Sequence, residues 1–230
     1  MYVTRPYQQK LNSEIKKMLK PNQVLYYLLD DLYRFRFFVD LTERHWHEEA
    51  NKYDQSDIEN DEITHWERYK YRNDLSADFE ETFPQRQKQF FLVMLISLFE
   101  DSLNQLCHSL YTEKGLRLSL REYKSQEKTS SSIECAKNYL RKIASVKIPT
   151  DLPSWNELKD ATAIRNIIVH NFGYVDENLH GNHLKIIRKN KSLKIHHYAR
   201  IHLEIEQQYV VKIIEAMETF VKKFLLDLTK

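Results

Sequence analysis

The fold is decided by the stretch Phe90-Phe91-Leu92-Val93-Met94-Leu95-Ile96, in which every side chain is apolar. A helix that is apolar on all faces belongs in the interior of a protein. The pattern around it predicts a central helix over 85–111, and Glu113-Lys114-Gly115 is typical of a helix C-terminus. The apolar run 90–99 is too short to span a bilayer, so we expect a buried helix here.

Working outward, apolar residues at spacings of three and four predict more helices. These cover 21–46, 62–82, a segment that starts at the Thr-Ser-Ser-Ser run 129–132 and ends near Ser145, 154–173 and 210–228. The connector 116–128 is expected to hold at most one short turn. Leu184–Ile187 and Leu193–Ile195 resemble the strands of a small hairpin. The sequence therefore predicts an all-α, up-and-down helical bundle of about five to six helices, with a small β-hairpin insertion near residues 184–196.

Composition excludes several function classes. The chain of 230 residues has 3 glycines, where an average chain of this length has about 16. Their positions cannot form a dinucleotide fingerprint or a phosphate-binding P-loop. Two cysteines allow neither a disulfide framework nor a cysteine zinc site. The first 20 residues carry charges along their whole length and contain no apolar stretch, so we expect no signal peptide and a soluble, cytoplasmic protein.

We expect two parts along the chain. Residues 1–83 form an N-terminal helical extension of unknown role, and residues 84–230 form the bundle. No internal repeat or low-complexity segment interrupts either part.

Charge is unevenly distributed, although the net charge is only +2. The window 178–203 contains no Asp or Glu, and it includes Lys185, Arg188 and Lys189 together with five histidines. A basic patch on a nearly neutral chain favours contact with a polyanion, and these three residues are the candidate RNA-binding residues. A solvated hairpin surface is the equally good alternative.

The best candidate for a catalytic site lies at the end of the helix predicted over 154–173. Asn166 and His170 are four residues apart and share a helix face, whereas Arg165 and His170 lie about 140° apart around an ideal helix. Metal-free RNA cleavage needs proton transfer near neutral pH, which histidine suits, and a cation for the phosphate, which arginine supplies. The alternative is a surface arginine and a C-terminal histidine that complements the helix dipole.

The segment Ile164-Arg165-Asn166-Ile167-Ile168-Val169-His170-Asn171-Phe172-Gly173 resembles the R-x4-6-H signature of the HEPN superfamily. The polar residue after the arginine and the trailing Asn-x-Gly also match. The resemblance covers residues 84–230 and implies an all-α bundle. For many members it implies a metal-independent endoribonuclease of a toxin–antitoxin, abortive-infection or other defence system, with no cofactor. Arg165 and His170 would then be the catalytic pair, supported by Asn166.

Further residues and partners accompany this resemblance. Glu100, Asp101 and Asn171 are candidates for orienting the catalytic pair, although an ion pair or cap contact also explains the two acidic residues. One motif histidine per chain suggests a homodimer with a composite active site, because transesterification needs both a base and an acid. A cognate antitoxin or defence partner is expected, and no membrane. Some HEPN proteins are inactive, and the alternative function is a non-catalytic binding or scaffold module for a partner protein or nucleotide.

Overall fold

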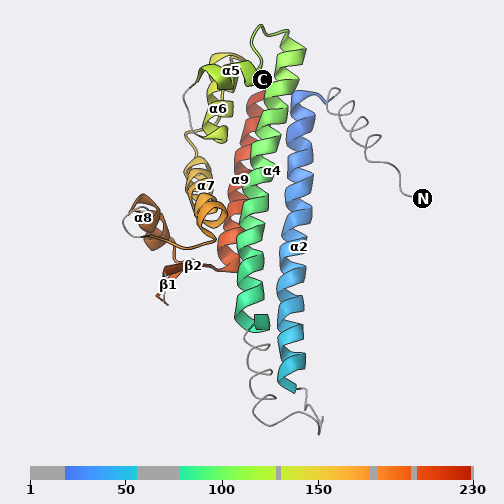
Figure 1. The fold of residues 1–230 in the computed structure, drawn as a ribbon. Helices are drawn as coiled ribbons and strands as arrows, with labels where there is room; N and C mark the ends of the chain where they lie inside the picture. Colours follow the sequence, from blue (N-terminus) through green and yellow to red (C-terminus); the bar gives the residue numbers. More distant parts are fainter. Residues whose placement is uncertain (1–18, 56–77, 128–130, 177–180, 198–200, 229–230) are drawn as a thin grey trace, which may run out of the picture. The chain divides into compact units, whose positions relative to one another are not determined.

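The structure is a computed structural model that describes residues 19–55, 78–127, 131–176, 181–197 and 201–228. In these ranges the chain forms seven α-helices, one short π-helix and one two-stranded antiparallel hairpin (Figure 1). The predicted all-α class with a β-hairpin insertion is confirmed. In chain order, the elements are α2 (Pro21–Gln55), η1 (Asp78–Thr82), α4 (Phe83–Lys114), α5 (Leu120–Gln126), α6 (Ser132–Lys142), α7 (Pro153–Asn171), α8 (Gly181–Lys189), β1 (Leu193–His197), β2 (Ile201–Ile205) and α9 (Gln207–Leu228).

The hairpin lies later in the chain than predicted. Leu184–Ile187 belongs to helix α8, so the expected first strand is wrong. Leu184 and Ile187 are buried at a spacing of three, which puts both on one helix face, whereas a half-buried strand needs alternating burial. The true partner of β1 is β2, with Leu193 opposite Ile205.

Two other segments also differ from expectation. The connector 116–128 contains helix α5, which begins at a capping box formed by Ser119 and Glu122. Most of the predicted helix 62–82 lies outside the described residues, and its last five residues form η1. The central helix is confirmed as α4, which extends the predicted range at both ends.

The described residues fall into two compact units. The first unit takes the described residues of 1–32, 95–158 and 215–230, and the second takes those of 33–94 and 159–214. Each unit therefore contains residues from both sides of position 83, and the boundary predicted there stays a prediction.

The first unit is built around aromatic rings from three helices. Phe220 of α9 contacts Phe99 of α4 edge-on, with ring centroids 5.5 Å apart, and stacks on Trp155 of α7 at 5.3 Å. All three side chains are buried. Rings of this size contribute much of the hydrophobic free energy of a core.

The second unit contains the antiparallel pairing of α2 with the start of α4 (Figure 1). Phe35 and Phe38 of α2 contact Phe91 of α4. Trp46, further along α2, contacts Phe83, which lies earlier in α4. The start of α4 is thus held in place where it meets the strands described below.

One helical stretch among the described residues, Asp78–Lys114, has the length and apolar composition of a membrane span. Half of its most apolar window is buried inside the protein, as in the core helix of a soluble protein. One helix of this kind is weak evidence for a membrane span.

Candidate functional site

Helix α7 carries the predicted motif. Ile164 and Ile167 are buried and fix which face of the helix points inward. Around the remaining surface, Arg165 and Asn166 are half-buried and His170 is exposed. The helix is continuous to Asn171. Asn166 and His170 therefore share a face as predicted, whereas Arg165 and His170 stay about 140° apart, because the last turn is not loosened.

A backbone hydrogen bond joins the end of α7 to the hairpin. Phe172 and Gly173 both have positive φ, +54° and +81°, and the Gly173 N–H donates back to the Ile167 carbonyl at 3.3 Å. The Gly173 carbonyl then accepts from the Leu203 N–H at 2.9 Å. This bond places the last turn of the motif helix directly beside β2.

The Gln89 side chain of α4 lies where the end of α7 meets β2. Its side chain is buried, its Nε2 donates to the Leu203 carbonyl at 3.1 Å, and its Oε1 accepts from Arg86 at 3.2 Å. A Cβ atom on Gly173 would lie 2.8 Å from Gln89 Nε2. Glycine is favoured here for two reasons, the left-handed backbone and the close approach of the Gln89 side chain.

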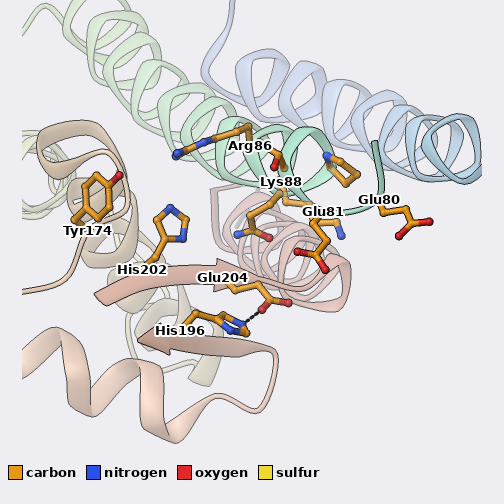
Figure 2. Close-up of a pocket in the computed structure, with 11 residues that line it drawn as sticks. Glu80, Glu81, Arg86, Lys88, Tyr174, His196, His202 and Glu204 are labelled. Atoms are coloured by element: carbon orange, nitrogen blue, oxygen red, sulfur yellow. Dashed lines mark hydrogen bonds and ion pairs between the residues drawn. The ribbon is translucent and has the colours of Figure 1, made fainter. Parts of the chain in front are cut away.

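A pocket of about 750 Å³ opens beside this junction, and we call it the α7-end pocket (Figure 2). Its walls come from η1, the start of α4, the segment after α7 and both strands, all within the second unit. The lining residues are Glu80, Glu81, Thr82, Pro84, Gln85, Arg86, Lys88, Tyr174, His196, His202 and Glu204.

Two ionisable pairs involve residues of the pocket. Glu204 pairs with His196 across the hairpin, as the dashed line in Figure 2 shows. Lys88 pairs with Glu43 of α2, with Nζ and the carboxylate oxygen 3.4 Å apart.

Arg86 differs from these residues. Its Nη1 donates to Gln89 Oε1 and, at 3.3 Å, to the Phe172 carbonyl, and both acceptors are uncharged. In the part of the chain that the structure describes, no carboxylate neutralises the Arg86 guanidinium.

His202 is the most unusual group in the pocket. Its ring contacts Tyr174 edge-on, with centroids 5.5 Å apart, and its Nε2 atom is buried without a hydrogen-bond partner among the described residues. Burial lowers the pKa of His202, and the nearby Arg86 and His196 lower it further, whereas Glu204 opposes them. His202 is therefore a neutral imidazole at neutral pH.

The predicted RNA-binding residues lie on α8. Lys185, Arg188 and Lys189 are all exposed, and their spacing of three and four puts them on one helix face. A strand would have turned the neighbours Arg188 and Lys189 to opposite faces. The helix instead gathers the three cations into one patch, which we call the α8 basic face.

The candidates for orienting the catalytic pair lie in both units. Asn171 is the last residue of α7 in the second unit, whereas Glu100 and Asp101 lie on α4 in the first unit. Asp101 is exposed and accepts a hydrogen bond from Gln105. A role for these three residues in catalysis stays a prediction. No group of three or more His, Cys, Asp or Glu among the described residues is placed to hold a metal ion.

Sequence reasoning missed the residues that surround the end of α7. Arg86 and Gln89 lie more than 80 positions before Gly173, and no local pattern links them to the motif. His202 belongs to the acid-free, histidine-rich window, which was the one available signal. Only the folded chain shows which of its histidines meets the motif helix.

No protein family, no curated protein and no solved structure matches this chain.

Proposed function

We propose that this protein is a metal-independent endoribonuclease of a toxin–antitoxin, abortive-infection or related defence system in the cytoplasm. The observation that supports it is the surface of α7, where His170 is exposed and Arg165 and Asn166 are half-buried. The α8 basic face belongs to the same compact unit. The resemblance of this segment to the HEPN signature supports the same function.

The proposed reaction uses the ordinary chemistry of these side chains. The RNA 2′-oxygen attacks the adjacent phosphorus and loses its proton to a histidine, while the leaving 5′-oxygen receives a proton. Arg165 stabilises the negative charge that builds on the phosphate, and Asn166 orients the phosphate or the ring. The products are a 2′,3′-cyclic phosphate and a 5′-hydroxyl. Lys185, Arg188 and Lys189 hold neighbouring phosphates.

The proposed working unit is a homodimer with a shared cleft. One His170 per chain supplies one proton carrier, so a second copy would supply the other. Val169 and Phe172, which flank His170, are 45% and 74% exposed. Exposed apolar side chains of this kind suit burial against a second motif helix.

Cleavage of single-stranded RNA in EDTA tests the proposal. We expect His170→Ala and Arg165→Ala to lower the rate at least about 100-fold. His108→Ala and Arg121→Ala are matched controls, because both residues are exposed on helices of the first unit, and they should leave the rate unchanged. A requirement for a divalent metal, or products without a 2′,3′-cyclic phosphate, would overturn the proposal.

Charge reversal tests the α8 basic face separately. Changing Lys185, Arg188 and Lys189 together to Glu should weaken RNA binding about 100-fold near 0.1 M salt and reduce the slope of log affinity against log salt by about 2. The melting temperature should change little, since exposed charges contribute little to stability. RNA affinity that is unaltered across the salt titration would assign this face to simple solvation.

Mixing the two inactive variants tests the shared cleft. A mixture of the Arg165→Ala protein and the His170→Ala protein should regain part of the activity if each cleft takes residues from both copies. A monomer by light scattering, with no activity in the mixture, would contradict the shared cleft.

A second candidate function is a HEPN-like binding or scaffold module for a partner protein or nucleotide, without catalysis. The observation that favours it is the intact last turn of α7, which keeps Arg165 and His170 about 140° apart within one chain. RNA binding without cleavage by the wild-type protein would favour this candidate. In that case His170→Ala would leave toxicity or protection in cells unchanged.

A further inference from the structure

The α7-end pocket has two chemically different ends. Figure 2 shows Arg86, Tyr174 and His202 at one end, and Glu80 and Glu81 at the other. Its volume of about 750 Å³ lies within the range of roughly 300–1,000 Å³ that small-molecule sites occupy. The ligand that fits must therefore differ chemically from one end to the other.

The Arg86 end suits one phosphate group. The hydrogen bonds that Arg86 makes within the described residues come from Nη1 and go to uncharged oxygens. A guanidinium has five N–H donors, so donors and an unneutralised charge remain for a ligand. A phosphate matches this fork of donors better than any neutral group does.

His202 adds an unused hydrogen-bonding group at the same end. Its ring lines the pocket, and the described part of the chain leaves its buried Nε2 without a partner. Nε2 is covered by the protein beside Gly173, so a ligand in the pocket would meet the ring through its other nitrogen, Nδ1. The ring is neutral, and it can therefore donate to a phosphate oxygen without adding a second charge beside Arg86.

The opposite end suits N–H donors. Glu80 and Glu81 are exposed carboxylates, which accept hydrogen bonds and repel a second phosphate. The amino group of cytosine donates to a carboxylate, whereas uracil has a carbonyl oxygen at the same position. This end therefore distinguishes a base with an exocyclic amino group from uracil.

We propose that the α7-end pocket binds one nucleotide, with its phosphate at Arg86 and His202 and an amino-bearing base at Glu80 and Glu81. The identification of this nucleotide as part of an RNA substrate rests on the proposed function. Because the pocket adjoins the last turn of α7, the bound nucleotide would then lie near the cleaved bond and make cleavage base-selective. Nucleotide binding itself does not depend on cleavage.

Calorimetric titration of the full chain with cytidine monophosphate, uridine monophosphate and cytidine tests this site. Cytidine monophosphate should bind about 10-fold or more tightly than uridine monophosphate, because each well-placed base contact discriminates at about this level. It should also bind more tightly than cytidine, which has no phosphate. Equal, or no measurable, binding of all three at millimolar concentration would overturn the proposal.

Two variants separate the ends of the pocket. Arg86→Gln should weaken binding of cytidine monophosphate about 10- to 100-fold, with no effect on cytidine. Glu80→Gln combined with Glu81→Gln should abolish the preference over uridine monophosphate. Arg121→Gln and Glu113→Gln, which change exposed residues of the first unit, are the matched controls. Binding and base preference that stay unchanged in both pocket variants would place the nucleotide elsewhere.

Folding and catalysis are controlled in the same experiment. Arg86 also bonds to the Phe172 carbonyl, so melting curves should accompany Arg86→Gln, whereas the exposed Glu80 and Glu81 provide a test without this risk. His170→Ala should keep nucleotide binding and lose cleavage. If the wild-type protein binds the nucleotide through Arg86 but cleaves no RNA, the pocket is upheld and the endoribonuclease proposal fails.

Discussion

The α5–α6 region of the first unit and the end of α7 in the second unit both contain helix ends, but they differ in how well the local sequence suits them. Both are places where a helix ends and the backbone must change direction. In the α5–α6 region Ser119 caps α5 and Ser131 caps α6, each accepting from a backbone N–H at the start of its helix. Side-chain caps of this kind satisfy donors that a helix end leaves open.

Polar side chains in the α5–α6 region are also paired. The Tyr139 hydroxyl donates to the Leu118 carbonyl at 2.8 Å, although the ring is fully buried. Glu127 accepts from Tyr123 and, at 2.9 Å, from Lys142. Local sequence and tertiary packing agree in these contacts, although Ser145, just after α6, also has a left-handed backbone with φ of +54°.

The end of α7 shows the reverse. Phe172 has a left-handed backbone that an aromatic residue adopts at a cost, Gly173 has no room for a side chain, and His202 keeps a buried nitrogen without a partner among the described residues. Proteins tend to break local rules at functional sites and to keep them elsewhere. The contrast therefore supports the end of α7, rather than the α5–α6 region, as the place to look for function.

The largest expected effect separates two glycines with left-handed backbones. Gly173→Ala should destabilise the protein by about 3 kcal/mol, because it adds backbone strain to a contact of 2.8 Å with Gln89. Gly115→Ala should cost only about 1 kcal/mol, because φ is +58° but nothing lies within 4 Å. Urea unfolding measures both losses of stability. Equal losses would show that the close approach of Gln89 adds no cost at Gly173.

A smaller effect is expected from a paired hydroxyl. Tyr139→Phe removes the bond to Leu118 and leaves that carbonyl without its partner, which should cost about 1 kcal/mol. Burial raises the pKa of Tyr139 to about 12, so the wild-type hydroxyl stays protonated and the loss should be the same at pH 7 and pH 9. If Tyr139→Phe leaves the free energy of unfolding unchanged, the hydrogen bond from Tyr139 to Leu118 does not stabilise this region.

Phe172→Gly should have a similar or smaller effect of opposite sign. Glycine adopts the φ of +54° without strain, and the Phe172 side chain is 74% exposed, so little packing is lost. The relieved backbone strain exceeds the entropy that glycine adds to the unfolded chain, so we expect a gain of about 0.5–1 kcal/mol in the free energy of unfolding. Urea unfolding measures the change, and destabilisation instead would mean that the Phe172 ring stabilises the fold through contacts.

The smallest effects are in the pH dependence of stability, where the regions respond in different windows. The pKa of His202 is lowered by burial, so the unfolded chain takes up a proton first, and stability falls as the pH drops below about 6.5. Hydrogen bonds from Tyr123 and Lys142 lower the pKa of Glu127. Its contribution to stability is therefore present above about pH 4.5 and is lost as the pH falls below that value.

Denaturant unfolding of His202→Gln and Glu127→Gln checks these windows. His202→Gln should flatten the stability profile between about pH 7 and 5.5, and Glu127→Gln should flatten it below about pH 4.5. A His202→Gln profile that still falls like the wild type in its window would contradict the assignment.

The sequence by itself determined the helical class and most helix positions. The fully apolar stretch 90–96 required a core helix, and the spacing of apolar residues located α7 and α9, because periodicity reflects which face is buried. It also determined that Asn166 and His170 share a face, since four residues make about one helical turn. These are properties of contiguous residues.

Tertiary structure alone decided the rest. Leu184–Ile187 suits a strand or a helix by its residue types, and burial of Leu184 and Ile187 selects the helix that gathers the α8 basic face. The α7-end pocket joins Arg86 of α4 to His202 of β2, more than 100 positions apart. No local pattern encodes such a meeting, because it depends on how Gln89, Gly173 and Leu203 bring three separate segments together.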